Sequence, residues 1–303
     1  MRVMRSMHVP PGATIRVMRQ INAIFFAFLF LIATAGMAQV VDGDQHWALR
    51  AEGHTGGHAK AAQVDTAIAA YQRALAQKPD DLEAHSKLLR AYRFKGSYVA
   101  TTEDEEKKFY GEGKAAGEKA FVVLNRILAS KGVSSADKAA EKKVADAARS
   151  IPGAAECYFW DSANWGQWAL VYGKMAALRE GAADRIKREA TIALLIDPKL
   201  EGGGPARVLG RLHDQTPHVP FITGWASGKE AVRYLKESLK IDPTNKITRV
   251  FLAEAMVDDN SDTKAQAIQL LRETIAAPSD PEFIVEQDAA AEDAKELLKK
   301  WGA

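Results

Sequence analysis

The sequence predicts an all-α protein, built as an array of antiparallel helix pairs that enclose a cleft or pore. Alanine is abundant, alternation of β-branched residues is absent, and proline and glycine recur at intervals that suit helix pairs. Three expected helices end at Asp-Pro or just before a proline, at Pro198, Pro243 and Pro278, and each is followed by another helix. A tetratricopeptide unit is about 34 residues long with a proline after its second helix, so we expect degenerate repeats of this kind.

The first 38 residues have the three parts of a secretory signal peptide. Residues 1–20 carry four arginines and no acid, residues 23–33 are an unbroken apolar run, and small residues occupy the −1 and −3 positions of a cut after Ala38. We therefore expect cleavage after Ala38 and a periplasmic protein. One alternative is an uncleaved membrane anchor over residues 21–41, which are uncharged and long enough to span a bilayer. Pro10-Pro11 in the long first part leaves Met18 as an alternative start.

Cleavage changes the charge balance of the chain. It removes four arginines and no acid, so Lys and Arg fall from 41 to 37 against 39 acidic residues, and the formal net charge changes from +2 to −2. No basic patch then argues for nucleic acid as a partner. Cys157 is the only cysteine, which excludes a disulfide within the chain, and no cysteine follows the cleavage site, so we do not expect a lipoprotein. Residues 39–303 are expected to form a single helical-repeat domain.

The first expected helix pair covers residues 66–77 and 82–95. Ala67, Tyr71 and Ala74 share one face of the first helix, which ends before Pro79. The second helix directs Leu88 and Tyr92 inward and is expected to stop at Gly96. These positions match the small and aromatic residues with which tetratricopeptide helices cross.

Residues 100–150 do not fit the repeat and are predicted to be a non-repeat helical insertion. A helix over residues 102–128 opens with acids followed by lysines, an order that suits the helix dipole and indicates a solvated face. Residues 131–150 are rich in alanine and lysine and are expected to be a short helix on the surface.

The remaining helices follow the aromatic one in order. They are expected over residues 181–196, 206–213, 229–241, 247–257, 264–277 and 281–301. Ala231, Leu235 and Ser238 precede Pro243 at the same relative positions as in the first helix, so residues 229–241 are expected to be another second helix of a repeat. A proline-rich loop over residues 215–228 interrupts the array.

Residues 156–172 hold three of the six tryptophans, and helical spacing divides these between two faces. Trp160, Asn164 and Trp168 share one face, and Trp165 lies on the opposite one. A helix that is apolar on two faces must be covered on both, so we expect an inner helix. One interpretation is core packing. The other is that the face of Trp160, Asn164 and Trp168 lines a cavity in which the amide orients a ligand.

Glycines are expected to serve both packing and binding. Gly166 in the aromatic helix is expected to let another backbone come close. Gly204-Pro205, preceded by Gly203, has the order of an N-cap and a first helical residue. The free N–H groups of such a helix start favour an anion.

Arg207 lies in the first turn of this expected helix, where the helix dipole disfavours a positive charge. An acid is therefore expected nearby. One alternative is an internal partner, namely Glu156, Asp161 or Asp197. The other is the carboxylate of a ligand.

Several short motifs follow one another along residues 60–301. They are Trp160-x3-Asn164-Trp165-Gly166-x-Trp168-Ala169, Asp197-Pro198, Gly202-Gly203-Gly204-Pro205-x-Arg207-x-Leu209-Gly210, Ala231-x3-Leu235, Asp242-Pro243 and Pro278. This order resembles the T component (TatT) of tetratricopeptide-associated tripartite ATP-independent periplasmic (TRAP) transporters. The chain departs from the family in its longer loop at residues 215–227, in Gly228-Lys229 where Gly-Asp is expected, and in lacking the lipid-site cysteine of some relatives.

The resemblance implies an all-helical fold of cryptic repeats around a cleft or pore, without catalysis. It implies partnership with a periplasmic solute-binding protein, a small organic acid or hydrophobic ligand, and an assembly that includes a homo-oligomer. No cofactor is expected. The alternative function is a periplasmic tetratricopeptide scaffold that binds proteins and no small ligand. The candidate ligand-binding residues are Trp160, Asn164, Trp165, Trp168, Gly203, Gly204 and Arg207.

Two weaker patterns are set aside. His54 and His58 have the spacing of metal ligands on a helix, but Gly56-Gly57 between them breaks the helix that this spacing requires. Cys157 could pair with a histidine such as His213 in a thiol dyad, but a cysteine that begins a tryptophan-rich helix is expected to be buried and inert.

Overall fold

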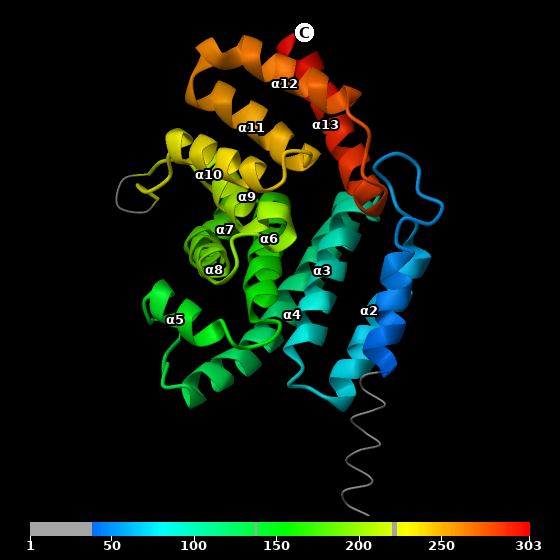
Figure 1. Cartoon of the computed structure of the whole chain (residues 1–303), viewed down its shortest axis with the longest axis vertical. Coiled ribbons are helices and arrows are strands. Elements are labelled where there is room, and N and C mark those ends of the chain that lie inside the picture. The colour runs from blue at the N-terminus through cyan, green and yellow to red at the C-terminus, as the bar shows by residue number, and fades with distance from the viewer. Residues whose placement is uncertain (1–37, 137, 220–222) are drawn as a thin grey trace, which may run out of the picture.

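The computed structural model describes residues 38–136, 138–219 and 223–303, and this part of the chain is helical, without a β-strand (Figure 1). The predicted fold class, an array of neighbouring helix pairs, is confirmed. The predicted signal peptide lies outside the described residues except for Ala38. Of the helices in the described ranges, none is long and apolar enough to cross a membrane.

The helices follow one another with connections that are short in most places and longer over residues 49–60, 131–140 and 216–227. After a helix over residues 38–48, they are α2 (Ala61–Gln77), α3 (Leu82–Tyr98), α4 (Glu103–Ser130), α5 (Glu141–Ala148), α6 (Ala154–Tyr172), α7 (Lys174–Arg179), α8 (Ala182–Ile196), α9 (Leu200–Gln215), α10 (Gly228–Ile241), α11 (Lys246–Asp259), α12 (Lys264–Ala276) and α13 (Ile284–Trp301). The helix over residues 38–48 and the short α7 were not predicted.

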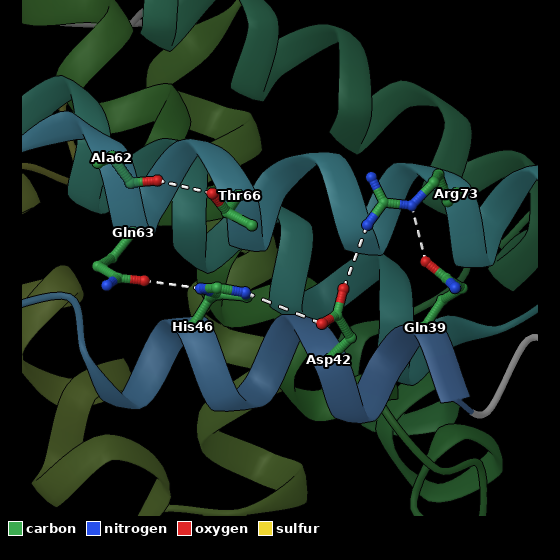
Figure 2. Close-up of polar contacts among 7 residues, drawn as sticks. All are labelled: Gln39, Asp42, His46, Ala62, Gln63, Thr66 and Arg73. Atoms are coloured by element: carbon green, nitrogen blue, oxygen red, sulfur yellow. Dashed lines mark hydrogen bonds and ion pairs between the residues drawn. The ribbon is translucent and has the colours of Figure 1, made fainter.

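The N-terminal helix packs along α2, as Figure 2 shows. Arg73 of α2 donates one hydrogen bond to Gln39 (2.7 Å) and another to Asp42 (3.2 Å). Further along the same pair of helices, the His46 ring lies 2.7 Å from the side-chain oxygen of Gln63. These polar contacts hold the start of the described chain against the first repeat.

The residues predicted to pack at helix crossings are buried. In α2, Ala67 and Tyr71 are fully buried, and Leu235 in α10 is too. One predicted boundary is wrong, because α3 continues through Gly96 to Tyr98. A side chain at Gly96 would collide with the ring of Tyr110, so this glycine permits the crossing of α3 and α4 and does not end a helix.

α4 and α5 are bound closely to the rest of the molecule. α4 packs on both α3 and α6. The predicted surface helix over residues 131–150 is wrong in extent and position, since α5 is only eight residues long and its Val144 and Ala148 are fully buried in the main core. The apolar side of this Ala/Lys helix packs against α8, which explains its burial.

The C-terminal helix returns to the N-terminal segment and closes the array. The Arg50 guanidinium lies 3.2 Å from the Glu286 carboxylate at the start of α13. The backbone N–H of Gly57 donates to Glu292 over 3.1 Å. In Figure 1, α13 accordingly begins beside the top of α3 and the loop that follows the first helix, and it runs from there to the C-terminus. The helices therefore enclose a central space.

Candidate functional site

A cavity of about 1090 Å³ lies inside the array. α6 forms its floor, α3 and α9 supply walls, and the starts of α11 and α13 face them. Ligand pockets are usually about 300–1,000 Å³, so this cavity is large enough for a small molecule with a long chain.

The face of α6 that lines the cavity includes Trp160, Ala163, Gly166, Gln167 and Leu170. Trp160 is therefore on the wall, as the cavity interpretation predicted. The glycine has an unexpected role: a side chain at this position would meet nothing within 4 Å. The prediction that Gly166 admits another backbone is wrong, because this position faces the open cavity.

Asn164 and Trp168 do not line the cavity, so the predicted shared binding face is wrong for these two residues. Asn164 is fully buried, and its amide donates to the backbone oxygens of Leu89 (3.0 Å) and Trp160 (2.9 Å). α4 covers this face of α6, and Gly113 of α4 is the position that lets the two helices touch, since a side chain there would clash with the Asn164 amide.

Trp165 and Trp168 belong to a packed aromatic cluster, in accord with the core interpretation. Both rings are buried, and their centroids lie 5.3 Å apart at an angle of 62°. The ammonium group of Lys114 lies 4.6 Å from each ring, a cation–π arrangement. These tryptophans stabilise the fold and do not contact the cavity.

The glycine triplet lies near the start of α9, where the backbone departs from helical geometry, and it serves conformation and packing. Gly202 and Gly203 have positive φ angles of 61° and 81°. A side chain at Gly204 would collide with the Phe159 ring, and one at Gly203 would crowd the backbone of Ser238. Gly203 and Gly204 are buried and do not line the cavity, so the structure does not bring them together with Trp160 and Arg207; only Gly202 of the triplet reaches the cavity.

Arg207 lines the cavity as predicted for a ligand contact. It donates to the backbone oxygen of Glu201 (3.2 Å) and to the Thr248 hydroxyl (3.3 Å), and it forms no ion pair with a carboxylate of the described residues. Burial lowers the pKa of Arg207, and the nearby Glu201 carboxylate opposes that shift.

None of the three predicted internal partners pairs with Arg207. The Asp161 carboxylate instead accepts from Arg185 over 2.7 Å. The internal-pair alternative is therefore wrong for those residues.

Four cavity residues on α3 were missed from the sequence: Arg90, Arg93, Phe94 and Tyr98. Burial raises the pKa of Tyr98 to about 12, so its hydroxyl stays protonated and can donate a hydrogen bond at neutral pH. The available signal was the spacing of Arg90 and Arg93, which places two arginines one turn apart on a helix whose other face is apolar.

Glu201 was missed as well. Burial raises the pKa of this carboxyl, while Arg90 and Arg207 act to lower it. In this part of the wall, Glu201 of α9 therefore lies near both Arg90 and Arg207, which are more than a hundred residues apart in sequence.

The two weaker patterns of the sequence lie away from this chemistry. Cys157 is fully buried, its thiol donates to the Leu82 backbone oxygen over 3.4 Å, and burial raises its pKa well above the ordinary value. His54 and His58 lie in turns outside any helix. Over the ranges that the structure describes, no group of His, Cys, Asp and Glu side chains could hold a metal ion.

No protein-family model matches this chain, and no curated protein matches it. The assignment of a function therefore depends on the motifs of the sequence and on the chemistry of the cavity.

Proposed function

We propose that this protein is a periplasmic ligand-binding accessory protein of a TRAP-type transporter. It would work with a solute-binding protein to bind or hand over an organic acid or a hydrophobic ligand, and it would carry out no catalysis. The ordered tryptophan and glycine motifs, which resemble those of the T component family, support the transporter context.

One observation carries the binding role, namely the half-open cavity of about 1090 Å³, whose wall holds aromatic side chains and partly buried arginines. A concave space of this volume, with apolar walls and a few polar groups, has the features of a small-molecule site. The position of Gly166 supports the same conclusion, because a larger residue there would fill the space without touching its neighbours.

The alternative function, a scaffold that binds proteins alone, has one observation in its favour. Apolar side chains are exposed near the end of α6 and in α7, among them Leu170, Met175 and Leu178. Exposed apolar patches of this kind mark contact surfaces for partners. The same residues line the rim of the cavity, so a partner seated there would also meet any bound ligand.

Native mass spectrometry of the exported protein tests the binding role. We expect a co-purified small molecule in the wild type and in Gly166→Ala, which adds one methyl group. Gly166→Leu should lose it, because the longer side chain enters the cavity. Ala129→Leu on the exposed surface of α4 is the matched control and should keep the ligand. Protein free of any ligand in all four variants, together with failure to bind organic acids, would favour the scaffold.

The transporter role needs a separate measurement. We expect a solute-binding protein of a TRAP system from the same organism to bind the purified protein in analytical ultracentrifugation. Absence of any such complex, with and without ligand, would contradict the transporter context while leaving ligand binding intact.

A further inference from the structure

The cavity differs in character between its two sides. Arginines and acids gather where α3 meets the starts of α9 and α13. Apolar side chains cover the part between the end of α6 and helices α7 and α8, among them Ala169, Leu170, Met175, Leu178 and Ile186. In Figure 1, α3 and α7 lie on opposite sides of α6, so the polar and apolar regions face different ends of the same space.

Some arginines on the wall already have acidic partners. Arg50 pairs with Glu286 at 3.2 Å. Arg211 pairs with Asp214 at 3.0 Å and with Glu254 at 2.5 Å. These two guanidinium groups are neutralised within the protein.

Arg90, Arg93 and Arg207 differ, because they form no ion pair with any carboxylate of the described residues. The Arg90 guanidinium lies over the Trp47 ring at 4.3 Å, and its Nε is buried without a hydrogen-bond partner among those residues. Arg93 donates to the Ser97 hydroxyl. Each guanidinium carries five N–H donors, so donors remain for a ligand.

Glu201 is the acid whose charge acts most strongly on Arg207, and its backbone has an unusual conformation. Its backbone is left-handed, with φ 49° and ψ 45°, a conformation that a residue with a side chain seldom adopts. Such strain persists only where the surroundings impose it, and it concentrates at ligand sites. The Glu201 carboxyl interacts with both Arg90 and Arg207. Asp242, which also lines the cavity, acts on Arg207 as well, but neither acid forms an ion pair with these arginines among the described residues.

We infer that the cavity binds an amphipathic anion, with an acidic head held by Arg90, Arg93 and Arg207 and an unbranched apolar tail lying along α6 toward α7. A long-chain carboxylate is the class of ligand that fits. The inference rests on the proposed function, because it requires a ligand in the same cavity.

The dimensions of α6 agree with such a tail. Trp160 and Gly173, which both line the cavity, are separated along the helix by about 20 Å at 1.5 Å per residue. Between them the wall carries Ala163, Gly166 and Ala169, whose small size leaves room for a chain along the helix. The protonated hydroxyl of Tyr98 adds a donor for the head on the α3 side.

The affinities of three probes separate the contribution of the acidic head from that of the apolar tail. The exported protein, stripped of co-purified molecules, is titrated with dodecanoate, dodecan-1-ol and propionate. We expect dodecanoate to bind about ten- to a hundredfold more tightly than the alcohol, since hydrogen bonds to charged groups add this much. Propionate, which has the head without the tail, should bind at least about a hundredfold more weakly than dodecanoate.

Substitutions then assign the head site. Arg207→Met and Arg93→Met should each reduce the preference for dodecanoate over the alcohol to within about threefold, because the carboxylate loses a charged partner that the neutral alcohol does not need. Affinity for the alcohol shows that each variant is folded. Arg126→Met is the matched control, because Arg126 pairs with Asp80 on the exposed side of α4, and its preference should equal that of the wild type.

The outcomes distinguish the inference from the proposed function. Equal affinity for dodecanoate and dodecan-1-ol, or full preference in both cavity variants, would overturn the acidic head and leave ligand binding in place. Propionate binding as tightly as dodecanoate would overturn the tail. A protein that binds none of the three probes and carries no co-purified ligand would contradict the proposed function itself.

Discussion

At the scale of single residues, the three tryptophans of α6 have two different roles, one in the core and one at the cavity. Trp165 and Trp168 are buried in the aromatic cluster, whereas Trp160 is half-buried and faces the cavity. Substitution of Trp165 or Trp168 should therefore change mainly the free energy of unfolding. Substitution of Trp160 should change mainly the affinity for ligand.

We predict that Trp165→Ala and Trp168→Ala each lower the free energy of unfolding by about 3–5 kcal/mol, as expected for large core side chains. Trp160→Ala should cost roughly half as much or less, because the ring already has open space on one side. Chemical denaturation measures these values. Equal losses in all three variants, with unchanged ligand content in Trp160→Ala, would show that Trp160 belongs to the core as well.

A second prediction at this scale concerns two buried carboxyl groups that share one arginine. Arg185 lies 2.7 Å from Asp161 and 2.8 Å from Glu189. Burial raises the pKa of Glu189 well above its ordinary value of 4.5, and the neighbouring Asp161 raises it further. The folded protein therefore binds more protons than the unfolded chain at this site.

The raised pKa of Glu189 in the folded protein determines whether the free energy of unfolding rises or falls with pH. Because the folded-state pKa of Glu189 is raised, its stabilising contribution is complete below about pH 4.5 and is lost as the pH rises through the folded value. Glu189→Gln should flatten the fall in unfolding free energy with pH above the ordinary carboxyl range. Thermal unfolding of the wild type and the variant between pH 4 and pH 9 would measure how the free energy of unfolding changes with pH. Parallel curves would contradict the assignment.

At the scale of elements, two glycines on neighbouring helices should respond to alanine in opposite ways. Gly117 of α4 packs so closely on α6 that an added methyl group would overlap the Asp161 carboxylate, whereas Gly166 of α6 faces open space. Alanine favours a helix interior over glycine by about 1 kcal/mol.

We predict that Gly166→Ala raises the free energy of unfolding by up to about 1 kcal/mol. Gly117→Ala should lower it by about 1–3 kcal/mol, since the extra methyl forces α4 away from α6. Urea denaturation of the two variants is the measurement. A stabilised Gly117→Ala variant would mean that α4 does not approach α6 at this residue.

At the scale of the whole molecule, closure of the array depends on contacts between its two ends. Arg50 lies between the Trp47 ring, at 4.8 Å, and the Glu286 carboxylate. Both charged groups are mostly buried, with side-chain exposures of 7% and 14%. Removal of the arginine would leave Glu286 buried without its partner, which is costly.

We predict that Arg50→Met lowers the free energy of unfolding by about 3–5 kcal/mol and speeds amide hydrogen exchange in residues 38–48 and at the start of α13. Arg73→Met is the control: its pair with Asp42 is exposed on the surface (Figure 2) and is worth at most about 1 kcal/mol. Unchanged exchange at both ends in Arg50→Met would show that other contacts hold the array closed.

The sequence by itself determined the helical class, most helix boundaries and the residues at helix crossings. Tyr71 and Leu235 could be placed inside from their spacing alone, because a helix has one period and its apolar side must be covered. The sequence also indicated Trp160 and Arg207 as residues of a binding surface, and both line the cavity.

Only the tertiary structure decided which neighbour covers each face. Periodicity shows that α6 is apolar on two sides, but it cannot show that α4 takes the side of Asn164 and leaves Gly166 to the cavity. Nor can it bring Arg90 of α3 next to Glu201 of α9, since that meeting depends on the path of the chain between them. The sequence pattern of a helix determines which of its faces must be buried. The packing of helices that are distant in sequence determines which residues cover each face.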